Sequence, residues 1–227
     1  IFGDMVSRRI RREPVSRILG TRAFWKSDFE VTPAVLDPRP ETECLIESAL
    51  ARFKARKDET LHILDLGTGS GALICSLLLE FPNATGVACD VSGPALEVAR
   101  HNAERIGVLE RLSLLHGSWS DLDQRQRDII VSNPPYIETP EILDLEPEVA
   151  GFDPWLALDG GPDGLDCYRE IAPLIQSALA PGGWAFVEIG YKQAALVSHI
   201  FRNSGLKVAR VVADTAGLDR GLEVETI

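Results

Sequence analysis

The sequence predicts an α/β protein built on a doubly wound, mostly parallel sheet of seven strands. From Leu61 onward, short apolar segments alternate with segments that have the periodicity of amphipathic helices. The apolar segments are hydrophobic continuously rather than at every second residue, which is typical of strands covered by helices on both faces. Glycine-rich or polar residues follow several of these strands, as expected where such a sheet binds ligands.

Seven segments read as strands, and they are Leu61–Gly67, Ala84–Asp90, Arg111–Gly117, Arg127–Asn133, Gly182–Gly190, Leu206–Ala213 and Gly221–Thr226. The helices expected between them are Gly71–Phe81, Gly93–Gly107, Gly164–Ala180 and a segment near Lys192–Ser204. Pro94 in the first turn and Gly107 at the end mark the limits of the second of these helices. A short turn separates the last two strands, so we expect an antiparallel C-terminal hairpin at the edge of the sheet.

Residues before about Leu36 do not follow this alternation. We interpret residues 1–20 as the truncated tail of an N-terminal helical domain, residues 21–38 as a linking β-hairpin, and residues 39–227 as the α/β domain. The chain begins with Ile1 rather than methionine, which indicates a fragment or a processed product.

The composition excludes several classes of protein. The chain has 227 residues and a net charge of −11, which disfavours a partner that is a bare nucleic-acid backbone. No segment is apolar for long enough to span a membrane. The four cysteines and four histidines show no metal-ligand spacing, so we expect no metal and free thiols in a reducing, cytoplasmic compartment.

One local exception is the basic N-terminus, which contains Arg8, Arg9, Arg11, Arg12 and Arg17. We favour a solvated helix end as its explanation. The alternative is a contact with RNA or a ribonucleoprotein, and this is the one place where we expect direct nucleic-acid binding to be conceivable.

A glycine loop follows the first strand. Gly67, Gly69 and Gly71 allow a sharp turn and a close approach of the backbone to a ligand. With Ala72, the loop also fits the dinucleotide fingerprint, so the glycines alone leave the ligand open, and a simple strand-to-helix turn would explain them too.

Two acidic residues narrow the choice of ligand. Asp90 ends the second strand, where a carboxylate can accept hydrogen bonds from both ribose hydroxyls. Asp65 precedes the glycine loop, where its charge would repel a pyrophosphate but suits an ammonium and a sulfonium. S-adenosylmethionine carries both cations and a ribose. The alternative for Asp65 is an acid that stabilises the loop or the helix dipole.

Trp119 follows the third strand and could cover the adenine face, although it could equally belong to the core.

The fourth strand ends in Asn133, Pro134, Pro135 and Tyr136, which face the same crevice as the glycine loop. A planar nitrogen acceptor, such as an amide or aromatic amine, must be held with its N–H groups occupied and its lone pair aimed at the methyl carbon. Asn133 can accept one N–H, and the carbonyl of Pro134 can accept the other because the two prolines fix the backbone. Tyr136 offers a flat face. The alternative is a proline turn that simply ends the strand.

The Asn-Pro-Pro-Tyr run, with Asp65–Gly71 upstream, resembles the amino-methylating branch of class I S-adenosylmethionine-dependent methyltransferases, whose fold is Rossmann-like. A narrower resemblance, to the HemK/PrmC family of release factor glutamine N5-methyltransferases, covers nearly the whole chain. The segments that carry it are Glu13–Trp25, Val35–Glu43, Phe152–Leu158 and Gly160–Ile171.

This resemblance implies methylation of the glutamine in the Gly-Gly-Gln loop of a peptide chain release factor, with S-adenosyl-L-homocysteine as the other product. It implies that residues 39–227 are the methyltransferase domain and that Asn133–Tyr136 hold the glutamine. The cofactor would contact Gly67, Thr68, Gly69, Ser70, Gly71, Asp90, Trp119 and Asn133, together with Asp65.

The segment Asp37–Glu43 combines a helix start with a residue that a helix start does not explain. Pro40 with Glu41 and Glu43 in a first turn is favourable for a helix. Arg39, rigidly presented between two prolines, has no such explanation. We hypothesise that Arg39 and Glu41 help to shape the cofactor or substrate pocket.

Other functions remain open from the sequence alone. They are glutamine methylation of a ribosomal protein, adenine-N6 methylation of DNA or RNA, a non-catalytic scaffold that binds S-adenosylmethionine, and a NAD-dependent dehydrogenase. The acidic net charge opposes methylation of DNA or RNA. The intact Asn133–Tyr136 run opposes a non-catalytic scaffold, and Asp65 opposes a NAD-dependent dehydrogenase.

Overall fold

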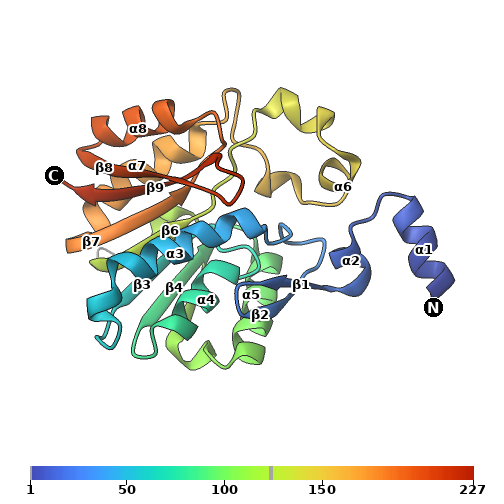
Figure 1. Ribbon diagram of the computed structural model, residues 1–227, viewed down its shortest axis with the longest axis horizontal. Helices are drawn as coiled ribbons and strands as arrows, with labels where there is room; N and C mark the ends of the chain where they lie inside the picture. Colours follow the sequence, from blue (N-terminus) through green and yellow to red (C-terminus); the bar gives the residue numbers. More distant parts are fainter. Residues whose placement is uncertain (1, 123–124) are drawn as a thin grey trace.

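Seven strands form one sheet in the order β5-β4-β3-β6-β7-β9-β8 (Figure 1). This computed structural model describes residues 2–122 and 125–227. The strands are β3 His62–Leu66, β4 Thr85–Asp90, β5 Leu112–His116, β6 Arg127–Ser132, β7 Leu179–Glu188, β8 Leu206–Ala213 and β9 Asp219–Thr226. The predicted seven-stranded, mostly parallel sheet is therefore confirmed.

The C-terminal hairpin is also confirmed, but its two strands are not placed as a simple extension of the sheet. β9 lies between β7 and β8 and is antiparallel to both. β8 is therefore the edge strand, and it carries Lys207 and Arg210, whereas residues 221–224 of β9 are all buried. Charged side chains on an edge strand discourage pairing with other chains, which agrees with this order.

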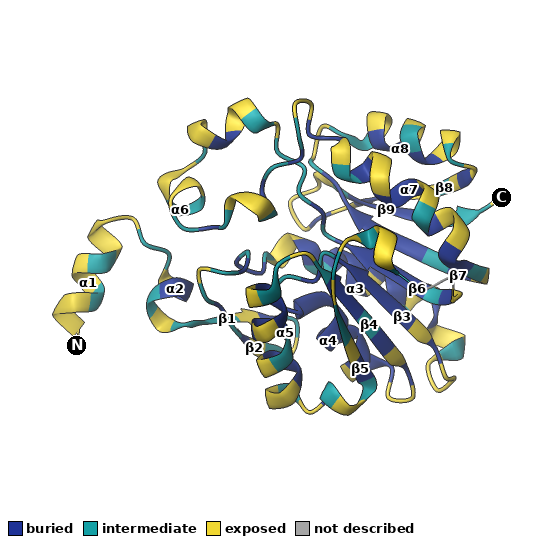
Figure 2. Cartoon of the chain, turned by 180° about the vertical axis from the view of Figure 1, so that it is seen from behind, coloured by how far each residue is buried: buried dark blue, intermediate teal, exposed yellow. Residues whose placement is uncertain are grey.

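Helices cover both faces of the sheet. On one face, α3 (Glu43–Arg52), α4 (Ala72–Glu80) and α5 (Gly93–Ile106) pack over a core that includes Ile129 and Val131. On the other face, α7 (Asp166–Ala178) and α8 (Ala194–Asn203) pack over a core that includes Ile130. Consecutive residues of β6 thus enter different cores, and most residues of the central strands β3 and β6 are buried (Figure 2). This is why the strands read as continuously apolar.

The limits of α5 follow from its end residues, as predicted. The Ser92 side chain accepts a hydrogen bond from the N–H of Ala95 at 3.2 Å, and Pro94 lies in the first turn. Gly107 ends the helix with a left-handed φ of 81°, a conformation that costs glycine little. α5 therefore begins directly after the loop that follows β4, at the carboxyl ends of the parallel strands.

The predicted N-terminal hairpin is present and packs on the α/β domain. It consists of β1 (Thr21–Phe24) and β2 (Ser27–Glu30). Phe24 and Phe29 are buried in the same core as α4, and the Trp25 indole donates a hydrogen bond to Glu80 at 2.9 Å. These contacts fix the hairpin beside α4.

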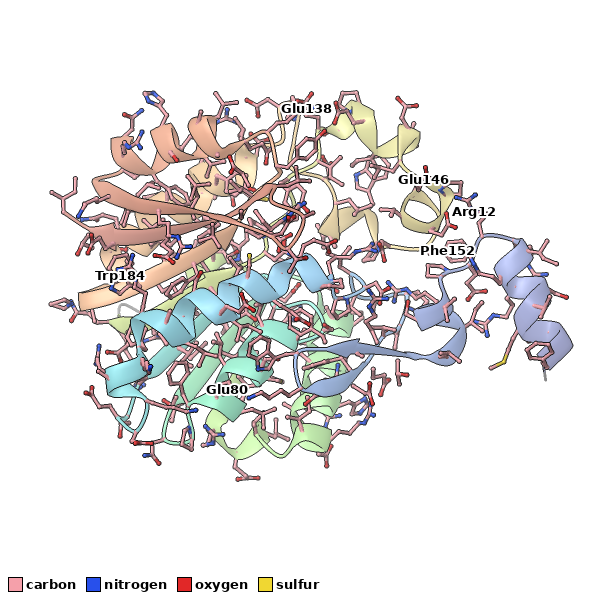
Figure 3. The ribbon with its side chains drawn as sticks, in the orientation of Figure 1. Arg12, Glu80, Glu138, Glu146, Phe152 and Trp184 are labelled. Carbon is pink, nitrogen blue, oxygen red and sulfur yellow. The ribbon has the colours of Figure 1, made fainter. Side chains whose placement is uncertain are left out.

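The first two helices are α1 (Phe2–Ile10) and α2 (Val15–Leu19), and α1 lies at one end of the molecule with most of its surface exposed (Figure 2). The basic N-terminus ends α1 at an exposed position, as expected, and most of its arginines are in addition ion-paired. Arg12 lies 2.7 Å from Glu146 (Figure 3) and 2.6 Å from Glu148. Arg9 also pairs with Glu148, and the buried Arg17 pairs with Asp153. The same pairing leaves less positive charge available for RNA. That residues 1–20 end a helical domain stays a prediction, and Ile1 lies outside the described residues.

The remaining helical segments are short, with three to six residues each. They are η1 Pro40–Thr42, η2 Lys54–Arg56, η3 Leu109–Arg111, η4 Trp119–Asp121, η5 Thr139–Asp144, α6 Pro147–Ala150 and η6 Trp155–Ala157. Within the described part of the chain, no helix combines the length and hydropathy that crossing a bilayer requires.

Candidate active site

The site lies where β3 and β6 run side by side at the centre of the sheet. Leu66 is in register with Ser132, and the Ser132 hydroxyl donates a hydrogen bond to the Leu66 carbonyl at 2.7 Å. The chain leaves β3 toward α4 on one face, while the helix that follows β6 packs on the other face. The loop after β3 and Asn133 after β6 therefore open side by side, as expected at a topological switch point.

A cavity of about 290 Å³ occupies this position. Its lining contains most of the residues predicted to bind the cofactor, namely Asp65, Gly67, Thr68, Gly69, Ser70, Asp90, Trp119 and Asn133. Residues that the sequence did not assign to the site also line it, including Val35, Leu36, Ser92, Pro154, Leu156 and Ala157. A single cavity therefore connects most of the predicted cofactor residues with Asn133 and Pro135 of the predicted acceptor residues.

The glycine loop takes the conformation that its composition predicts. Gly67 and Gly69 have φ values of 75° and 54°, which other residues adopt only with strain. Gly71, predicted to contact the cofactor, is not among the cavity-lining residues. It precedes α4 with a φ of 78°, and a methyl group added there would lie 3.2 Å from Ala99 Cβ. The absence of a side chain at Gly71 therefore permits the close packing of the start of α4 against α5.

Asp65 is an acid with an unfilled hydrogen-bonding position. Its side chain is 1% exposed, and the Thr68 hydroxyl donates to Oδ2 at 2.7 Å. Oδ1 is buried without a partner among the described residues. Burial raises the pKa of this carboxyl to about 7, and the neighbouring Asp90 adds to the rise. An unpaired carboxylate oxygen beside a cavity suits a cationic ligand group.

Asp90 and Trp119 lie on the other side of the loop. Asp90 accepts hydrogen bonds from the N–H groups of Gly69 and Ser92, each at 2.9 Å. A carboxylate oxygen has a second lone pair, so both oxygens can still accept a hydroxyl proton. A methyl group added at Gly67 would lie 4.0 Å from the Trp119 ring, so the indole covers the loop.

The Asn133 side chain is held by residues from two other segments. Its Nδ2 donates to Thr42 Oγ1 at 3.2 Å, and the Thr42 hydroxyl donates to Glu188 Oε2 at 2.5 Å. Glu188 ends β7 and is 1% exposed, and burial raises its pKa to about 7. Sequence analysis assigned no role to Thr42 or Glu188. The available signal for Glu188 was the one used for Asp65 and Asp90, a carboxylate at the carboxyl end of a buried parallel strand.

Comparisons with known proteins agree with this geometry. A release factor glutamine methyltransferase from Caulobacter vibrioides is 48% identical over 220 residues, which cover 96% of this chain and 75% of that protein. Another from Bradyrhizobium diazoefficiens is 46% identical and matches 95% of this chain and 73% of its own length. This chain belongs to the release factor glutamine methyltransferase family.

Two further comparisons concern the domain and the fold. The family model described as the methyltransferase small domain matches residues 42–145 of this family member. A crystal structure of a methyltransferase from Pyrococcus furiosus superposes with a TM-score of 0.63 over 97% of both chains, at 19% identity. The predicted class I methyltransferase fold is thereby confirmed.

In this family member, the four residues after β6 do not all face the cavity. Asn133 and Pro135 line it, whereas Pro134 and Tyr136 are not among the lining residues. The Tyr136 hydroxyl donates to Glu188 Oε1 at 3.3 Å. The predicted stacking of a planar substrate group on Tyr136 thus stays a prediction, and the observed contact of Tyr136 is with Glu188.

Arg39 and Glu41 are placed differently from one another. Arg39 lines the cavity and donates to Asp153 Oδ2 at 2.6 Å. Arg17 reaches Asp153 Oδ1 at 2.8 Å, so one carboxylate ties α2 and the loop before η1 to the stretch that covers the cavity. Glu41 is exposed and does not line the cavity, so the structure offers no support for its predicted part.

The structure also describes the groups considered for metal binding. All four cysteines have free thiols. Among the described residues, no three His, Cys, Asp or Glu side chains form a group able to hold a metal ion.

Proposed function

We propose that this protein transfers a methyl group from S-adenosylmethionine to the side-chain amide nitrogen, N5, of the glutamine in the Gly-Gly-Gln motif of a peptide chain release factor. The observation that carries the proposal is the Asn133 carboxamide. Its Nδ2 is engaged by Thr42, and no described residue donates a hydrogen bond to its Oδ1. It lies in the same cavity as the glycine loop and Asp65.

The residues present fit S-adenosylmethionine. The unpaired Asp65 Oδ1 suits the ammonium group, Asp90 can accept from the ribose hydroxyls, and Trp119 can cover the adenine. Asp65 and Asp90 both line the cavity as acids, which favours a cation over a dinucleotide pyrophosphate. When bound, the cofactor supplies an electrophilic methyl group on a sulfonium.

The residues after β6 hold the acceptor. Asn133 Oδ1 accepts one N–H of the glutamine carboxamide, and the carbonyl of Pro134 accepts the other. With both N–H groups held, the nitrogen lone pair points at the methyl carbon. A C–N bond forms as the C–S bond breaks, and one amide proton is released to solvent.

Positioning and electrostatics account for the rate. An amide nitrogen is a poor nucleophile, so alignment with the methyl group is the main contribution of the protein. Oxygen acceptors on the N–H groups also stabilise the positive charge that develops on nitrogen during attack. The reaction requires no nucleophilic cysteine, lysine or histidine.

Support for a release factor as the substrate comes from two sources. The relatives at 48% and 46% identity are named release factor glutamine methyltransferases. The net charge of −11 disfavours DNA and RNA as substrates because it would repel their phosphates. A function in translation and four free thiols are both consistent with a cytoplasmic protein.

The experiment uses methyl-labelled S-adenosylmethionine with separate samples of a release factor, a ribosomal-protein mixture, and DNA or rRNA. Label should appear on the release factor and disappear when the Gly-Gly-Gln glutamine is replaced. Label on ribosomal proteins or nucleic acid instead would refute the proposal.

The Asn133→Ala variant tests the acceptor site in the same assay. Transfer should fall by at least about 10³-fold, since a positioned hydrogen-bond acceptor of the transition state is lost. Cofactor affinity, measured by calorimetry, should fall much less. Unchanged turnover would remove the proposed role of Asn133.

A further inference from the structure

The direction of the Asn133 carboxamide decides whether this site can hold an amide substrate. The oxygen and the NH₂ group of an asparagine side chain occupy nearly the same shape, and a half-turn exchanges them. With the oxygen toward the cavity, Asn133 accepts an N–H from the substrate. With the NH₂ group toward the cavity, two donors would face each other.

While Glu188 is ionised, the hydrogen bonds around Thr42 permit only one of these directions. The Thr42 hydroxyl has a single proton, and it donates that proton to Glu188 Oε2 at 2.5 Å. An ionised carboxylate only accepts hydrogen bonds, so it cannot donate to Thr42 in return. Thr42 Oγ1 is therefore left as an acceptor toward Asn133, which places Nδ2 on Thr42 at 3.2 Å and turns Oδ1 away from it.

The two residues that impose this direction are themselves fixed. Glu188 is 1% exposed at the end of β7, and its other oxygen, Oε1, accepts a hydrogen bond from Tyr136. Thr42 is 4% exposed at the end of η1 and lines the cavity next to Asn133. We call the chain of hydrogen bonds from Asn133 through Thr42 to Glu188 the relay. Its members come from three separate segments of the fold, which are the loop after β6, η1 and β7.

We propose that Thr42 and Glu188 are positioning residues, which hold the Asn133 carboxamide with its oxygen toward the methyl acceptor. This inference rests on the proposed function, because it concerns how the same site grips a carboxamide nitrogen. It also gives Tyr136 a part in the site, since the tyrosine hydroxyl occupies the second oxygen of Glu188.

Thr42→Val tests the relay at nearly constant shape, because it replaces only the hydroxyl by a methyl group. The expected result at about pH 8, where Glu188 is ionised, is a fall in kcat of at least about tenfold with cofactor affinity within about twofold. Thr42→Ser keeps the hydroxyl and should restore kcat to within about threefold.

A matched control is Ser76→Ala. Ser76 is 1% exposed on α4, and its hydroxyl has no hydrogen-bond partner among the described residues. Removing a buried hydroxyl at this position should leave kcat unchanged. Should Thr42→Val fail to fold, Glu188→Gln takes its place, because an amide can donate as well as accept and no longer imposes one direction.

A second measurement separates this inference from the proposed function. Hydrogen exchange of the Asn133 side-chain NH₂ group, followed by NMR in the absence of any substrate, should be slow in the wild type and in Thr42→Ser. It should be fast in Thr42→Val or Glu188→Gln. This result would support the relay even if the protein failed to methylate a release factor.

Three results would overturn the inference. They are a kcat for Thr42→Val within about twofold of wild type, an equal loss in Thr42→Ser and Thr42→Val, or NH₂ exchange that is the same in all variants. A Thr42→Val variant that lost cofactor affinity as strongly as turnover would also contradict it, because the pocket itself would then be damaged.

Discussion

Replacing Asp65 with asparagine is expected to change how the stability of the cofactor-free protein depends on pH. Asp65 is 1% exposed, one of its oxygens has no partner, and Asp90 lies nearby as a second acid. Burial raises the pKa of the Asp65 carboxyl from the ordinary value of 3.8 to about 7. The ionised form, which would suit a cationic ligand group, is thus costly in the protein alone.

The sign and the size of the effect follow from proton linkage. A carboxyl that binds its proton more tightly in the folded state contributes stability below its unfolded pKa, and this is lost as pH rises through the folded pKa. The window therefore runs from about 3.8 to about 7. That difference corresponds to an upper limit of about 4 kcal/mol in the free energy of unfolding. In Asp65→Asn, the buried NH₂ group without a partner costs about 1–3 kcal/mol at every pH.

Asp65→Asn should therefore be less stable than wild type near pH 4. Its free energy of unfolding relative to wild type should rise steadily until about pH 7 and change no further above that pH. Urea unfolding followed by circular dichroism, without cofactor and at constant ionic strength, measures this difference. Asp58→Asn, which removes an exposed carboxylate, is the control for the change in net charge.

Parallel stability profiles of wild type and Asp65→Asn between about pH 4 and 8 would refute this reasoning. They would mean that the Asp65 carboxyl titrates alike in the folded and unfolded chains. If the stability of Asp65→Asn relative to wild type fell as pH rose, a positively charged group near the carboxylate would have to lower its pKa.

Three further predictions concern the ligands of the cavity. Calorimetry should show that S-adenosylmethionine binds wild type more tightly as pH rises toward about 7, because an ammonium group selects the ionised Asp65. The Asp65→Asn variant should bind the cofactor weakly and with little dependence on pH. The same pH dependence of binding in both proteins would contradict this prediction. Trp119→Ala should raise the Kd of the cofactor by about tenfold through lost stacking area, and an unchanged Kd would place the ring outside the adenine site. Arg39→Ala should weaken cofactor binding or turnover by at least about threefold, because the ion pair with Asp153 is lost. The control is Glu41→Gln, which changes an exposed residue. Wild-type binding and turnover in both variants would refute the hypothesis for Arg39.

The alternation of apolar and amphipathic segments was sufficient to predict the strands and the main helices. β8 agrees at both ends, whereas β7 begins at Leu179 instead of the predicted Gly182. The sequence Pro181-Gly182-Gly183 carries the signals of a turn, yet Leu179 pairs with Arg127 across an irregularity in the ladder. Here the neighbouring strand overrides local preference, and such pairing is invisible in one sequence.

The position of β9 could not be predicted for a similar reason. Hydrophobic pattern identifies a hairpin, but it does not state which strand inserts next to β7. The buried run of β9 and the charges of β8 are consistent with the observed order, although they became decisive only once the partners were known.

The candidate site divides in the same way. Asp65, Asp90 and Asn133 were predicted because each ends a strand, and parallel strands end at one edge of a sheet. Thr42 lies 91 positions before Asn133 and 146 before Glu188, and no local pattern connects residues so far apart. That Gly71 and Tyr136 touch ligands stays a prediction; the structure shows Gly71 packed against α5 and Tyr136 hydrogen-bonded to Glu188.

By itself, the sequence of this protein determined the fold class, the crevice and the acids that line it, because periodicity and strand-end polarity are local properties of the chain. Only the tertiary structure decided which way the Asn133 carboxamide faces. That direction depends on the hydrogen bond that the Thr42 hydroxyl donates to Glu188, and this contact exists only once η1, β7 and the loop after β6 lie together.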